Sequence, residues 1–332
     1  MINYKEFDNK TILITGGSGS IGSYLTESLL ETNCKSIRIL SNNEYELYNL
    51  EKKFSYSKKL RLFLGDIRDK NRLRVATEGV DIVFHAAALK HVPICEFNPF
   101  DAVQTNVIGT QNIIESSIQS NVEKFVFIST DKAASPLSTL GATKLLAERL
   151  TISAMAYRKS LTKPIMYCIR FGNVIGTKGS VLELFLDQVK RGDPLTITNN
   201  EMTRFTMTKK DAINLILSTV EIAKGGEIFV LKMKALKILD LAKSIISLYS
   251  KIPKTHQIIE TKIREGEKLH ESLIANDEIS RFKDFGNMYV IPPPNSNEYD
   301  HLETLQNSYS SNDNNMMTIE EIQKMLNEIS EN

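Results

Sequence analysis

The sequence lacks the features that would direct the protein to nucleic acid or to a membrane. Its 332 residues carry a formal net charge of +1, which gives no electrostatic reason to expect an anionic partner of either kind. No apolar run approaches the ~18 residues of a membrane span, and the N-terminus has no apolar signal-peptide core. We therefore expect a cytoplasmic protein that binds neither nucleic acid nor membranes.

Cysteine is also scarce. The three cysteines, Cys34, Cys95 and Cys168, are scattered along the chain, and none forms a C-x-x-C pair. Isolated cysteines are typical of a reducing compartment, and a structural zinc site would need closely spaced ligands. We expect no metal site.

The chain has the composition of an ordinary globular protein, with 42% hydrophobic and 24% charged residues. Up to about residue 175, short apolar segments alternate with helical ones. This alternation predicts an α/β fold, a Rossmann-like doubly wound parallel sheet with a smaller C-terminal substrate-binding domain. We assign residues 1–175 and 206–232 to the dinucleotide-binding domain. Residues 176–205 and 233–332 form the substrate-binding portion and the C-terminal tail.

The pattern also places individual elements. The expected strands are residues 11–15, 36–40, 60–64, 82–84, 125–129 and 165–170, and the expected helices are 22–31, 44–54, 70–77, 101–120 and 141–159. Beyond residue 175 we expect irregular structure over 179–205, a helix over 209–223, a strand over 227–230 and a long surface loop over 292–315. Thr318 and Glu321 have the spacing of a capping box that opens a last amphipathic helix.

The most familiar motif is a glycine-rich turn directly after the first strand, G-G-S-G-S-I-G. Its spaced glycines permit a tight turn, close approach of backbone N–H groups to a pyrophosphate, and close packing of a helix on the strand. The phosphate then lies at the positive end of that helix. The turn predicts a dinucleotide site, and an ordinary βα turn without a ligand is the alternative. The residues assigned to this site are Gly16, Ser18, Gly19, Ser20, Ile21 and Gly22.

The second strand ends at Ser41 and Asn42, where NAD-binding proteins place an acidic residue and NADP-binding proteins an arginine. This chain has neither residue. Ser41 is small enough to admit a 2′-phosphate and Asn42 can donate a hydrogen bond to it, so we favour NADP and leave NAD open.

Two further strand ends complete the expected coenzyme site. Asp66 and Ile67 follow the third strand where an adenine ring would lie, with a plain turn aspartate as the alternative for Asp66. The fourth strand ends in His85, which we expect to be a core residue, and three alanines follow. Their small side chains suit a surface against which a flat cofactor lies. They are Ala86, Ala87 and Ala88.

The stretch S-T-D-K-A-A-S-P-L-S-T-L-G-A-T-K (residues 129–144) carries the acid–base groups. A strand ending near Ser129 delivers Thr130, Asp131 and Lys132 side by side. A carboxylic acid beside an amine suits the removal of water, since one group gives a proton while the other takes one. Lys144 follows on the next helix. Leu140 stands where a sugar-nucleotide dehydrogenase would carry tyrosine, which shifts the acid–base burden onto the acid–amine pair.

Other polar residues are candidates for a second ligand. Lys90 lies at the carboxyl edge of the expected sheet, where open α/β folds bind ligands. Two distant arginines, Arg204 and Arg264, suit bidentate binding of one diphosphate, although composition alone favours a surface ion pair for either. Asn173, Ser180 and Glu267 lie in apolar or glycine-bearing contexts.

With these residues in place, the chain resembles the extended short-chain dehydrogenase/reductase superfamily. Within it, the chain resembles the UDP-N-acetylglucosamine 4,6-dehydratases. The matching stretches include T-I-L-I-T-G-G-S-G-S-I-G, H-A-A-A-L-K-H-V-P, S-T-D-K-A-A-S-P and R-E-G-E-K-L-H-E, which run from residue 11 to residue 271.

The resemblance implies a redox-neutral dehydration of UDP-N-acetylglucosamine by a homo-oligomer that pairs through helices of the sheet domain. It assigns Asp131 as the acid that protonates the 6-hydroxyl and Lys132 as the base that takes the carbon 5 proton. Lys144 would orient the nicotinamide ribose, and Ser129 would also contact the coenzyme. Without a tyrosine, the 4-hydroxyl proton would pass to Thr130 or Asp131. The UDP-sugar site would be lined by Lys90, Asn173, Ser180, Arg204, Arg264 and Glu267.

Two other functions compete with this one. A UDP-hexose 4-epimerase shares the fold and coenzyme, but it needs no acid–base pair for carbons 5 and 6. A dinucleotide-binding sensor that has lost catalysis is supported by Leu140 alone, and it has no physical reason to keep a buried acid–amine pair.

Overall fold

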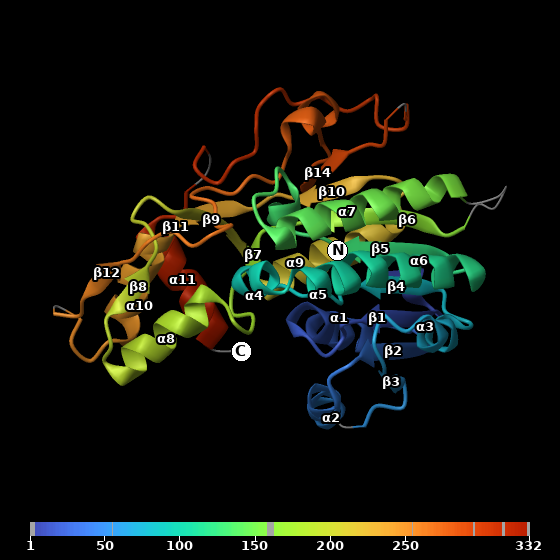
Figure 1. Cartoon of the computed structure of the whole chain (residues 1–332), viewed down its shortest axis with the longest axis horizontal. Helices are drawn as coiled ribbons and strands as arrows, with labels where there is room; N and C mark the ends of the chain where they lie inside the picture. Colours follow the sequence, from blue (N-terminus) through green and yellow to red (C-terminus); the bar gives the residue numbers. More distant parts are fainter. Residues whose placement is uncertain are drawn as a thin grey trace.

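The computed structural model describes residues 4–54, 56–157, 163–253, 255–294, 296–313 and 316–330. Its centre is a nine-stranded sheet with the order β13-β14-β10-β6-β5-β4-β1-β2-β3 (Figure 1). The pairings from β10 to β3 are parallel, and β14 and β13 join one edge antiparallel. The strands are β1 (Thr11–Thr15), β2 (Ser36–Ser41), β3 (Leu60–Leu64), β4 (Ile82–His85), β5 (Lys124–Ile128), β6 (Ile165–Arg170), β10 (Ile228–Leu231), β13 (Lys283–Asp284) and β14 (Met288–Ile291).

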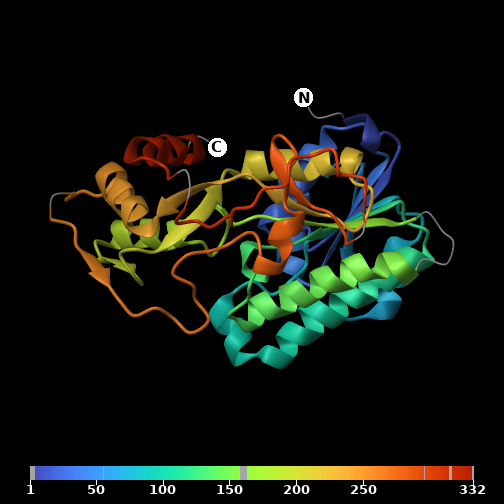
Figure 2. The same ribbon diagram turned by 90° about the horizontal axis from the view of Figure 1, so that it is seen from above.

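Helices cover both faces of this sheet (Figure 2). On one face α6 (Gly109–Gln119) lies between α3 (Lys70–Thr77) and α7 (Thr139–Ser153), and on the other α1 (Ser20–Leu30) packs beside α9 (Lys209–Ile222). A parallel sheet covered on both faces requires apolar side chains in both directions, and every residue of β1 is buried. The predicted Rossmann-like α/β fold is confirmed.

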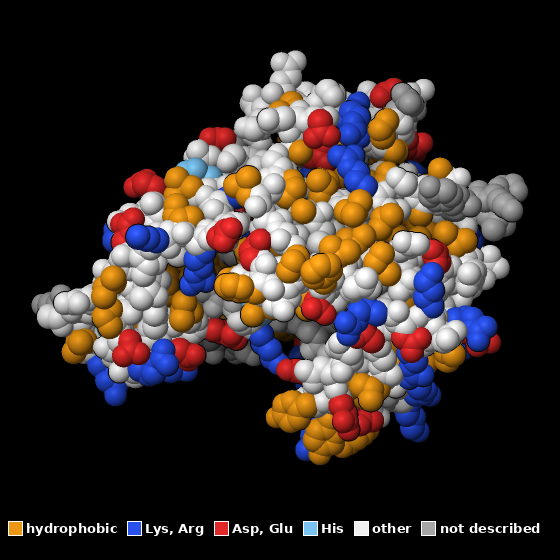
Figure 3. All heavy atoms as spheres, viewed as in Figure 1, with side chains coloured by type: hydrophobic (Ala, Val, Ile, Leu, Met, Phe, Trp, Pro, Cys, Tyr) orange, Lys and Arg blue, Asp and Glu red, His pale blue; other side chains and the backbone are white. Residues whose placement is uncertain are grey.

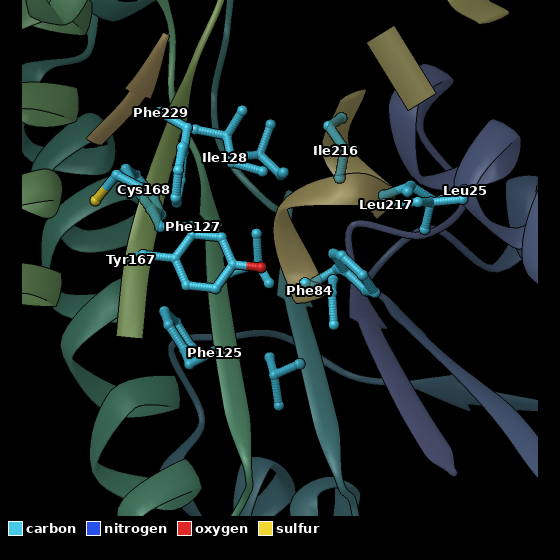
Figure 4. Close-up of a cluster of buried hydrophobic side chains, with 14 of the residues drawn as sticks. Leu25, Phe84, Phe125, Phe127, Ile128, Tyr167, Cys168, Ile216, Leu217 and Phe229 are labelled. Atoms are coloured by element: carbon cyan, nitrogen blue, oxygen red, sulfur yellow. The ribbon is translucent and has the colours of Figure 1, made fainter. Parts of the chain in front are cut away.

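The main core lies between the sheet and these helices (Figure 4). Phe84, Phe125 and Phe127 extend from neighbouring strands and are at most 1% exposed. Tyr167 is also fully buried, and its hydroxyl oxygen accepts a hydrogen bond from the Thr219 hydroxyl at 3.2 Å. This bond satisfies the polar end of a ring that otherwise contributes apolar area.

The remaining elements form a second body beside the carboxyl edge of the sheet, with its own buried apolar cluster (Figure 1). It contains a sheet of order β11-β9-β7 and the pair β12-β8. Strands β13 and β14 come from residues assigned above to the substrate-binding portion, yet they complete the large sheet. The elements are β7 (Asn173–Val174), α8 (Val181–Arg191), β8 (Leu195–Ile197), β9 (Thr203–Met207), β11 (Lys234–Lys237), α10 (Ile238–Tyr249), β12 (Ile258–Glu260) and α11 (Ile319–Ser330).

The expectation of irregular structure over residues 179–205 was wrong, since this stretch contains α8, β8 and β9. Leu182, Phe185 and Val189 recur at helical spacing and are buried, and Gly192 ends α8 with a φ of 75°. A helical period was therefore present, but it was obscured because the βα alternation stops there.

Two other expected segments differ. The helix expected over residues 101–120 is interrupted by a π-helical segment, Val103–Ile108, that follows α5 (Pro99–Ala102). In this segment the Asn106 side-chain amide accepts from the backbone N–H of Leu89 at 2.8 Å and donates to the Leu89 carbonyl at 3.2 Å. A regular helical pattern in the sequence does not predict such a contact with a distant strand end. The helix expected over 141–159 begins at Thr139 and ends at Ser153, and residues 158 and 159 lie outside the described residues.

The C-terminal expectations had mixed outcomes. Over residues 292–315, in the part that the structure describes, Tyr299, Tyr309 and Ser311 are buried, so this is not simply a surface loop. The two tyrosine hydroxyls donate to Glu227 and to the Met233 carbonyl, which draws the segment against the body. The capping box at α11 is confirmed, since Thr318 and Glu321 exchange hydrogen bonds of 3.2 and 3.1 Å.

A fully buried arginine joins three of these segments. Arg170, the last residue of β6, uses all five of its N–H donors. Two pair with Glu148 of α7 at 3.0 and 2.6 Å, and two with Glu278 at 2.7 and 3.1 Å. The fifth donates to the Leu273 carbonyl at 2.9 Å. The cluster therefore fixes α7 and residues 273–278 to the end of the sheet.

Removal of the guanidinium would leave two buried carboxylates without a counter-charge. We expect Arg170→Met to lower the free energy of unfolding by about 3–5 kcal/mol, measured by urea denaturation. The control is Arg149→Met in α7, next to Glu148, which breaks a partly exposed pair with Asp277 at 3.4 Å and should cost about 0–1 kcal/mol. Equal losses in the two variants would contradict a special role for the buried cluster.

Candidate active site

A cleft of about 860 Å³ lies where the carboxyl ends of β1, β2, β4 and β5 meet the second body. Figure 3 shows the surface hollowed between these two parts of the molecule. This edge of a doubly wound sheet, where the strand order reverses between β1 and β4, is the usual ligand site of the fold.

Most of the predicted site residues line this cleft. From the expected coenzyme set these are Gly16, Ser18, Gly19, Ser20, Ile21, Gly22, Ser41, Asn42, Asp66, Ile67, Ala86, Ala87, Ala88, Ser129 and Lys144. From the other sets they are Thr130, Lys132, Lys90, Asn173, Ser180 and Arg204. Asp131 is fully buried beneath its neighbours, whereas Arg264 is exposed and neither it nor Glu267 lines the cleft.

Two glycines of the turn are packed too closely to be replaced by a larger residue. Gly16 has a φ of +67°, and a Cβ there would lie 2.7 Å from the backbone of Ala87. A Cβ on Gly22 would lie 2.4 Å from the Cα of Gly17, so α1 starts in contact with the turn. The first N–H groups of α1 therefore border the cleft, where they favour an anionic group such as a phosphate.

The end of β2 is connected to both neighbouring turns. The Ser18 hydroxyl donates to that of Ser41 at 2.7 Å, and the Asn42 amide reaches Asp66 at 3.4 Å. Asp66 is also paired with Arg68 at 2.7 Å, and hydrogen bonds from Arg68 hold the pKa of Asp66 below its usual range. Part of the hydrogen-bonding capacity of Asn42 and Asp66 is therefore already used within the protein.

A crossing loop, residues 175–180, spans the cleft from the second body. The Lys178 ammonium pairs with both carboxylate oxygens of Glu46 at 2.8 and 3.0 Å. The Lys178 backbone N–H donates to the Ser20 hydroxyl at 3.2 Å, and its carbonyl accepts from the Lys90 ammonium at 2.6 Å. These contacts hold the loop against the starts of α1 and α2 (Glu44–Lys53).

At the end of β5 the acid–amine pair forms a continuous chain of polar contacts. The Thr130 hydroxyl donates to Asp131 Oδ1 at 2.8 Å, and the Lys132 ammonium donates to the same oxygen at 2.9 Å. Lys132 also lies 3.4 Å from Glu271 Oε1. Asp131 Oδ2 and Glu271 Oε2 are buried, and neither has a hydrogen-bond partner within the described part of the chain.

The charges of this group are strongly coupled. Burial disfavours the Lys132 ammonium, but the carboxylates of Asp131 and Glu271 outweigh it and raise the pKa of Lys132. Burial, and then the charge of Asp131, raise the pKa of Glu271, while Lys132, Arg204 and Lys268 act in the opposite direction. The site therefore holds Lys132 as an ammonium in the absence of ligand.

Lys144 and Leu140 come from the first turns of α7. The Lys144 ammonium donates to the Ile128 carbonyl at 2.7 Å and lies 4.2 Å from the centre of the Phe127 ring. Burial lowers the pKa of Lys144 to about 8. Leu140 is 4% exposed and packs in a small apolar cluster with Cys95, so this position supplies no proton.

His85 is a core residue, as expected. Its ring nitrogens lie 2.6 Å from the Thr15 hydroxyl and 2.9 Å from the Thr110 hydroxyl. Burial, with a smaller effect of the Lys144 charge, lowers the pKa of His85 to about 3, so the ring is neutral at physiological pH.

The predicted residues of the second ligand are only partly convergent. The Arg204 guanidinium donates to three backbone carbonyls and lies 3.4 Å from Glu267. Ser180 is the N-cap of α8, and its buried hydroxyl has no partner among the described residues. Arg264 is exposed and does not line the cleft, but its backbone N–H donates to the same Glu267 carboxylate at 3.2 Å. Binding of one diphosphate by both arginines stays a prediction.

Sequence reasoning assigned no role to four charged residues at the site. Glu46 and Lys178 connect the crossing loop to α2, and Glu271 and Lys268 stand behind Lys132. The stretch R-E-G-E-K-L-H-E contained a signal, because it is one of the stretches that carry the family resemblance and it includes both Lys268 and Glu271. Nothing local to Lys178 distinguishes it from a surface lysine.

Comparison with known proteins places these features in a family. A family model described as polysaccharide biosynthesis protein matches residues 12–293. The chain is 49% identical over 328 residues to the uncharacterized membrane protein MJ1061 of Methanocaldococcus jannaschii, covering 98% of this chain and 97% of that protein. In the described part of this chain, no helix combines the length and apolarity that crossing a membrane requires.

Two further relatives have named activities. The chain is 41% identical over 291 residues to the UDP-N-acetylglucosamine 4,6-dehydratase (inverting) of Campylobacter jejuni, covering 86% of this chain and 84% of that enzyme. It is 37% identical over 332 residues to the UDP-glucose 4-epimerase of Rickettsia canadensis, covering 96% of each.

Solved structures agree on the architecture. Pen from Bacillus thuringiensis superposes with a TM-score of 0.91 at 38% identity, covering 97% of this chain and 98% of that one. The UDP-glucuronic acid 4-epimerase of Bacillus cereus, in complex with UDP-glucuronic acid and NAD, gives a TM-score of 0.68 at 25% identity, covering 78% and 88%.

The crossing loop yields a prediction about ligand retention. Lys178→Ala removes the pair with Glu46, and a partly exposed pair is worth about 0–1 kcal/mol. We therefore expect a nicotinamide dinucleotide to dissociate about twofold to fivefold faster, as measured by stopped-flow displacement. Lys190→Ala on the exposed side of α8 is the control. Unchanged dissociation in Lys178→Ala would show that the loop does not restrain the ligand.

Proposed function

We propose that this chain, which belongs to the polysaccharide biosynthesis protein family of nucleotide-sugar dehydratases and epimerases, is a UDP-N-acetylglucosamine 4,6-dehydratase. Its substrate would be converted to the UDP-4-keto-6-deoxy-N-acetylhexosamine with loss of water. One observation carries the proposal: Asp131 and Lys132 are adjacent, in contact at 2.9 Å and set at the carboxyl end of β5. The named dehydratase relative supports it.

A UDP-hexose 4-epimerase is the second candidate, because another relative carries that name. Epimerisation at carbon 4 needs hydride transfer and one group to exchange the 4-hydroxyl proton. Epimerisation therefore leaves one of the two groups, Asp131 or Lys132, without a role in proton transfer. Elimination across carbons 5 and 6 needs both an acid and a base, and this requirement favours the dehydratase.

We propose a nicotinamide dinucleotide as coenzyme, with NADP favoured and NAD open. The turn at residues 16–22 fits a pyrophosphate, since the space beside Gly16 and Gly22 is closed by backbone and the start of α1 faces the cleft. A bound coenzyme would supply the hydride chemistry, namely removal of a hydride from carbon 4 of the sugar and its return to carbon 6. In this proposal Lys144 would hold the nicotinamide ribose, and Ser41 and Asn42 would border the 2′ position of the adenine ribose.

The residues at the end of β5 suit the proton transfers of this cycle. Thr130 takes the 4-hydroxyl proton while passing its own to Asp131 Oδ1, 2.8 Å away. Asp131 then gives this proton to the departing 6-hydroxyl, and Lys132 takes the proton from carbon 5. The start of α8, with the unpaired Ser180 hydroxyl, and Arg204 are available for the diphosphate of the substrate.

The test is conversion of UDP-N-acetylglucosamine in deuterated water, followed by proton NMR. We expect Asp131→Asn and Lys132→Ala to bind coenzyme normally and to lose about 10²–10⁴-fold in turnover, because each removes one proton-transfer group. Lys132→Ala should also lose deuterium incorporation at carbon 5.

Leu140→Ala serves as the control, since leucine has no proton to transfer and its loss should disturb packing more than chemistry. Near-normal turnover in both acid–base variants, beside a folded but inactive Leu140→Ala, would overturn these roles. A 4-epimer formed without deuterium at carbon 5 would favour the epimerase.

We also propose that the protein assembles with copies of itself through the face formed by α4 (Val92–Phe97), α5 and α7. The cytoplasmic location expected from the sequence stays a prediction. Apolar side chains gather over these elements (Figure 3). Phe97 and Phe100 are each 86% exposed, and Leu137 is 70% exposed. An apolar surface of this kind is typical of an interaction site.

The oligomer prediction has a direct test. Phe97→Asp combined with Phe100→Asp should convert the assembly to monomers, measured by size-exclusion chromatography with light scattering, since a charge at each position opposes apolar burial. Ile252→Asp, which alters an exposed residue of the second body, should leave the assembly intact. A wild-type monomer, or an unchanged assembly in the double variant, would contradict the proposal.

A further inference from the structure

We propose that Glu271 is a positioning residue of the active site, which shares a proton with Lys132 and so determines when Lys132 is a free amine. This inference rests on the proposed function, because it concerns the base of the dehydration. Glu271 belongs to the loop after β12, far from Lys132 in the sequence, and it does not line the cleft.

The geometry places one ammonium between two carboxylates. Lys132 Nζ lies 2.9 Å from Asp131 Oδ1 and 3.4 Å from Glu271 Oε1. The side chains of Asp131 and Glu271 are 0% and 3% exposed, whereas that of Lys132 is 26% exposed and lines the cleft. Glu271 therefore contacts the amine from the protein side, and the cleft side remains free for substrate.

Glu271 is held in place by the C-terminal segment. Its backbone N–H donates to the Ser311 hydroxyl at 2.9 Å, and its carbonyl accepts from the Ser311 N–H at 2.9 Å. The Ser311 hydroxyl is also 2.7 Å from that of Thr203 at the start of β9. This support fixes the backbone of Glu271, yet its Oε2 has no hydrogen-bond partner within the described residues. A buried carboxylate oxygen without a hydrogen bond costs folding free energy unless the carboxylate is neutralised by a proton or a counter-charge.

The charged groups around the pair come from three elements. Asp131 and Lys132 lie in the turn after β5, Arg204 lies on β9, and Lys268 lies 3.8 Å from Glu271 Oε2 on the same loop. Burial and Asp131 raise the pKa of Glu271, and Asp131 and Glu271 raise the pKa of Lys132 against its burial. Two groups shifted in this manner titrate as a pair rather than separately.

This coupling removes an obstacle to catalysis. As an ammonium, Lys132 has no lone pair with which to take the carbon 5 proton. Transfer of its proton from Nζ to Glu271 Oε1 leaves a neutral amine and a neutral carboxylic acid, with no change in total charge. The amine then forms an N–H bond with the carbon 5 proton, the C–H electrons form the carbon 5–carbon 6 double bond, and the 6-hydroxyl leaves as water with the Asp131 proton.

At the end of the cycle every proton is back on the group that held it at the start, apart from those lost in the water. When hydride adds to carbon 6, the Lys132 ammonium returns a proton to carbon 5 and becomes an amine again. The proton stored on Glu271 then moves back to Lys132, which restores the starting state. Glu271 thus touches neither substrate nor coenzyme and acts only through Lys132.

The first test measures the titration of Lys132 without turnover. Heteronuclear NMR of the enzyme with coenzyme bound and labelled lysine gives this titration, with the signal assigned by its absence in Lys132→Met. We expect Glu271→Gln to lower the Lys132 pKa by at least one unit, a tenfold change in acid constant, because a neighbouring negative charge is lost. Glu265→Gln, on the exposed part of the same loop, should leave the titration unchanged. A folded Glu271→Gln with an unaltered Lys132 titration would refute the inference.

The second test follows deuterium exchange at carbon 5 against pH. With an internal proton acceptor, the wild-type rate should be nearly flat around neutral pH, since the pair holds one proton throughout. In Glu271→Gln the proton must leave to solvent, so the rate should rise about tenfold per pH unit below the Lys132 pKa. Glu271→Asp keeps a carboxylate and should restore the flat profile at a lower rate.

The two proposals fail differently. An equal loss of rate at every pH in Glu271→Gln would assign Glu271 a merely structural role and sink this inference alone. A wild-type enzyme that neither dehydrates UDP-N-acetylglucosamine nor exchanges carbon 5 would refute the proposed function, and the Lys132 titration would then decide on Glu271 by itself.

Discussion

The active site depends on the buried cluster around Arg170. Its five hydrogen bonds join the end of β6 to Glu148 of α7 and to residues 273–278. Lys144 lies about one helical turn before Glu148, so its reach to the Ile128 carbonyl depends on how α7 is placed. Glu271 lies two residues before Leu273, whose carbonyl the same guanidinium binds. One buried side chain therefore positions Lys144 at the end of β5 and the Glu271 carboxylate behind Lys132.

The second constraint is electrostatic and lies within the site. Buried charges cost free energy even when they are paired, so a fold under selection for stability alone would replace them with apolar residues. Here Asp131 and Glu271 are both buried against one lysine, and each keeps an oxygen without a hydrogen-bond partner in the described chain. Such strained charge sets are typical of sites that move protons. A stabilised ammonium cannot act as a base, because Lys132 must first lose a proton. In the inference above, Glu271 is the second carboxyl group that can hold this proton.

Much of the sheet could be predicted from sequence because strands buried on both faces form continuous apolar runs. β1 and β6 begin and end where those runs do, and the bounds of the edge strand β3 were also predicted, although Arg61 interrupts its apolar residues. The second body was harder to predict, since the alternation of strands and helices stops before α8. Its helical spacing of apolar residues could not be matched to any predicted sheet. The site was predictable where it is local, at the glycine turn and at residues 130–132. Glu271 and Lys178 were missed because loops bring them from distant parts of the chain, Lys178 to the cleft and Glu271 to the protein side of Lys132. Arg264 belongs to a matching motif, yet it is exposed and does not line the cleft.

The leucine at position 140 connects these observations. In the proposed cycle a tyrosine would carry the 4-hydroxyl proton away from the acid that later expels the 6-hydroxyl. Leu140 packs against Cys95, and the proposed cycle uses instead the Thr130 hydroxyl, which donates directly to Asp131. Oxidation at carbon 4 then loads the very carboxyl group that elimination needs in its protonated form, so the first step prepares the second. An epimerase would gain nothing from this connection, because it returns the hydride to carbon 4 and has no hydroxyl to expel. The absence of the tyrosine is thus better explained by dehydration than by a loss of catalysis.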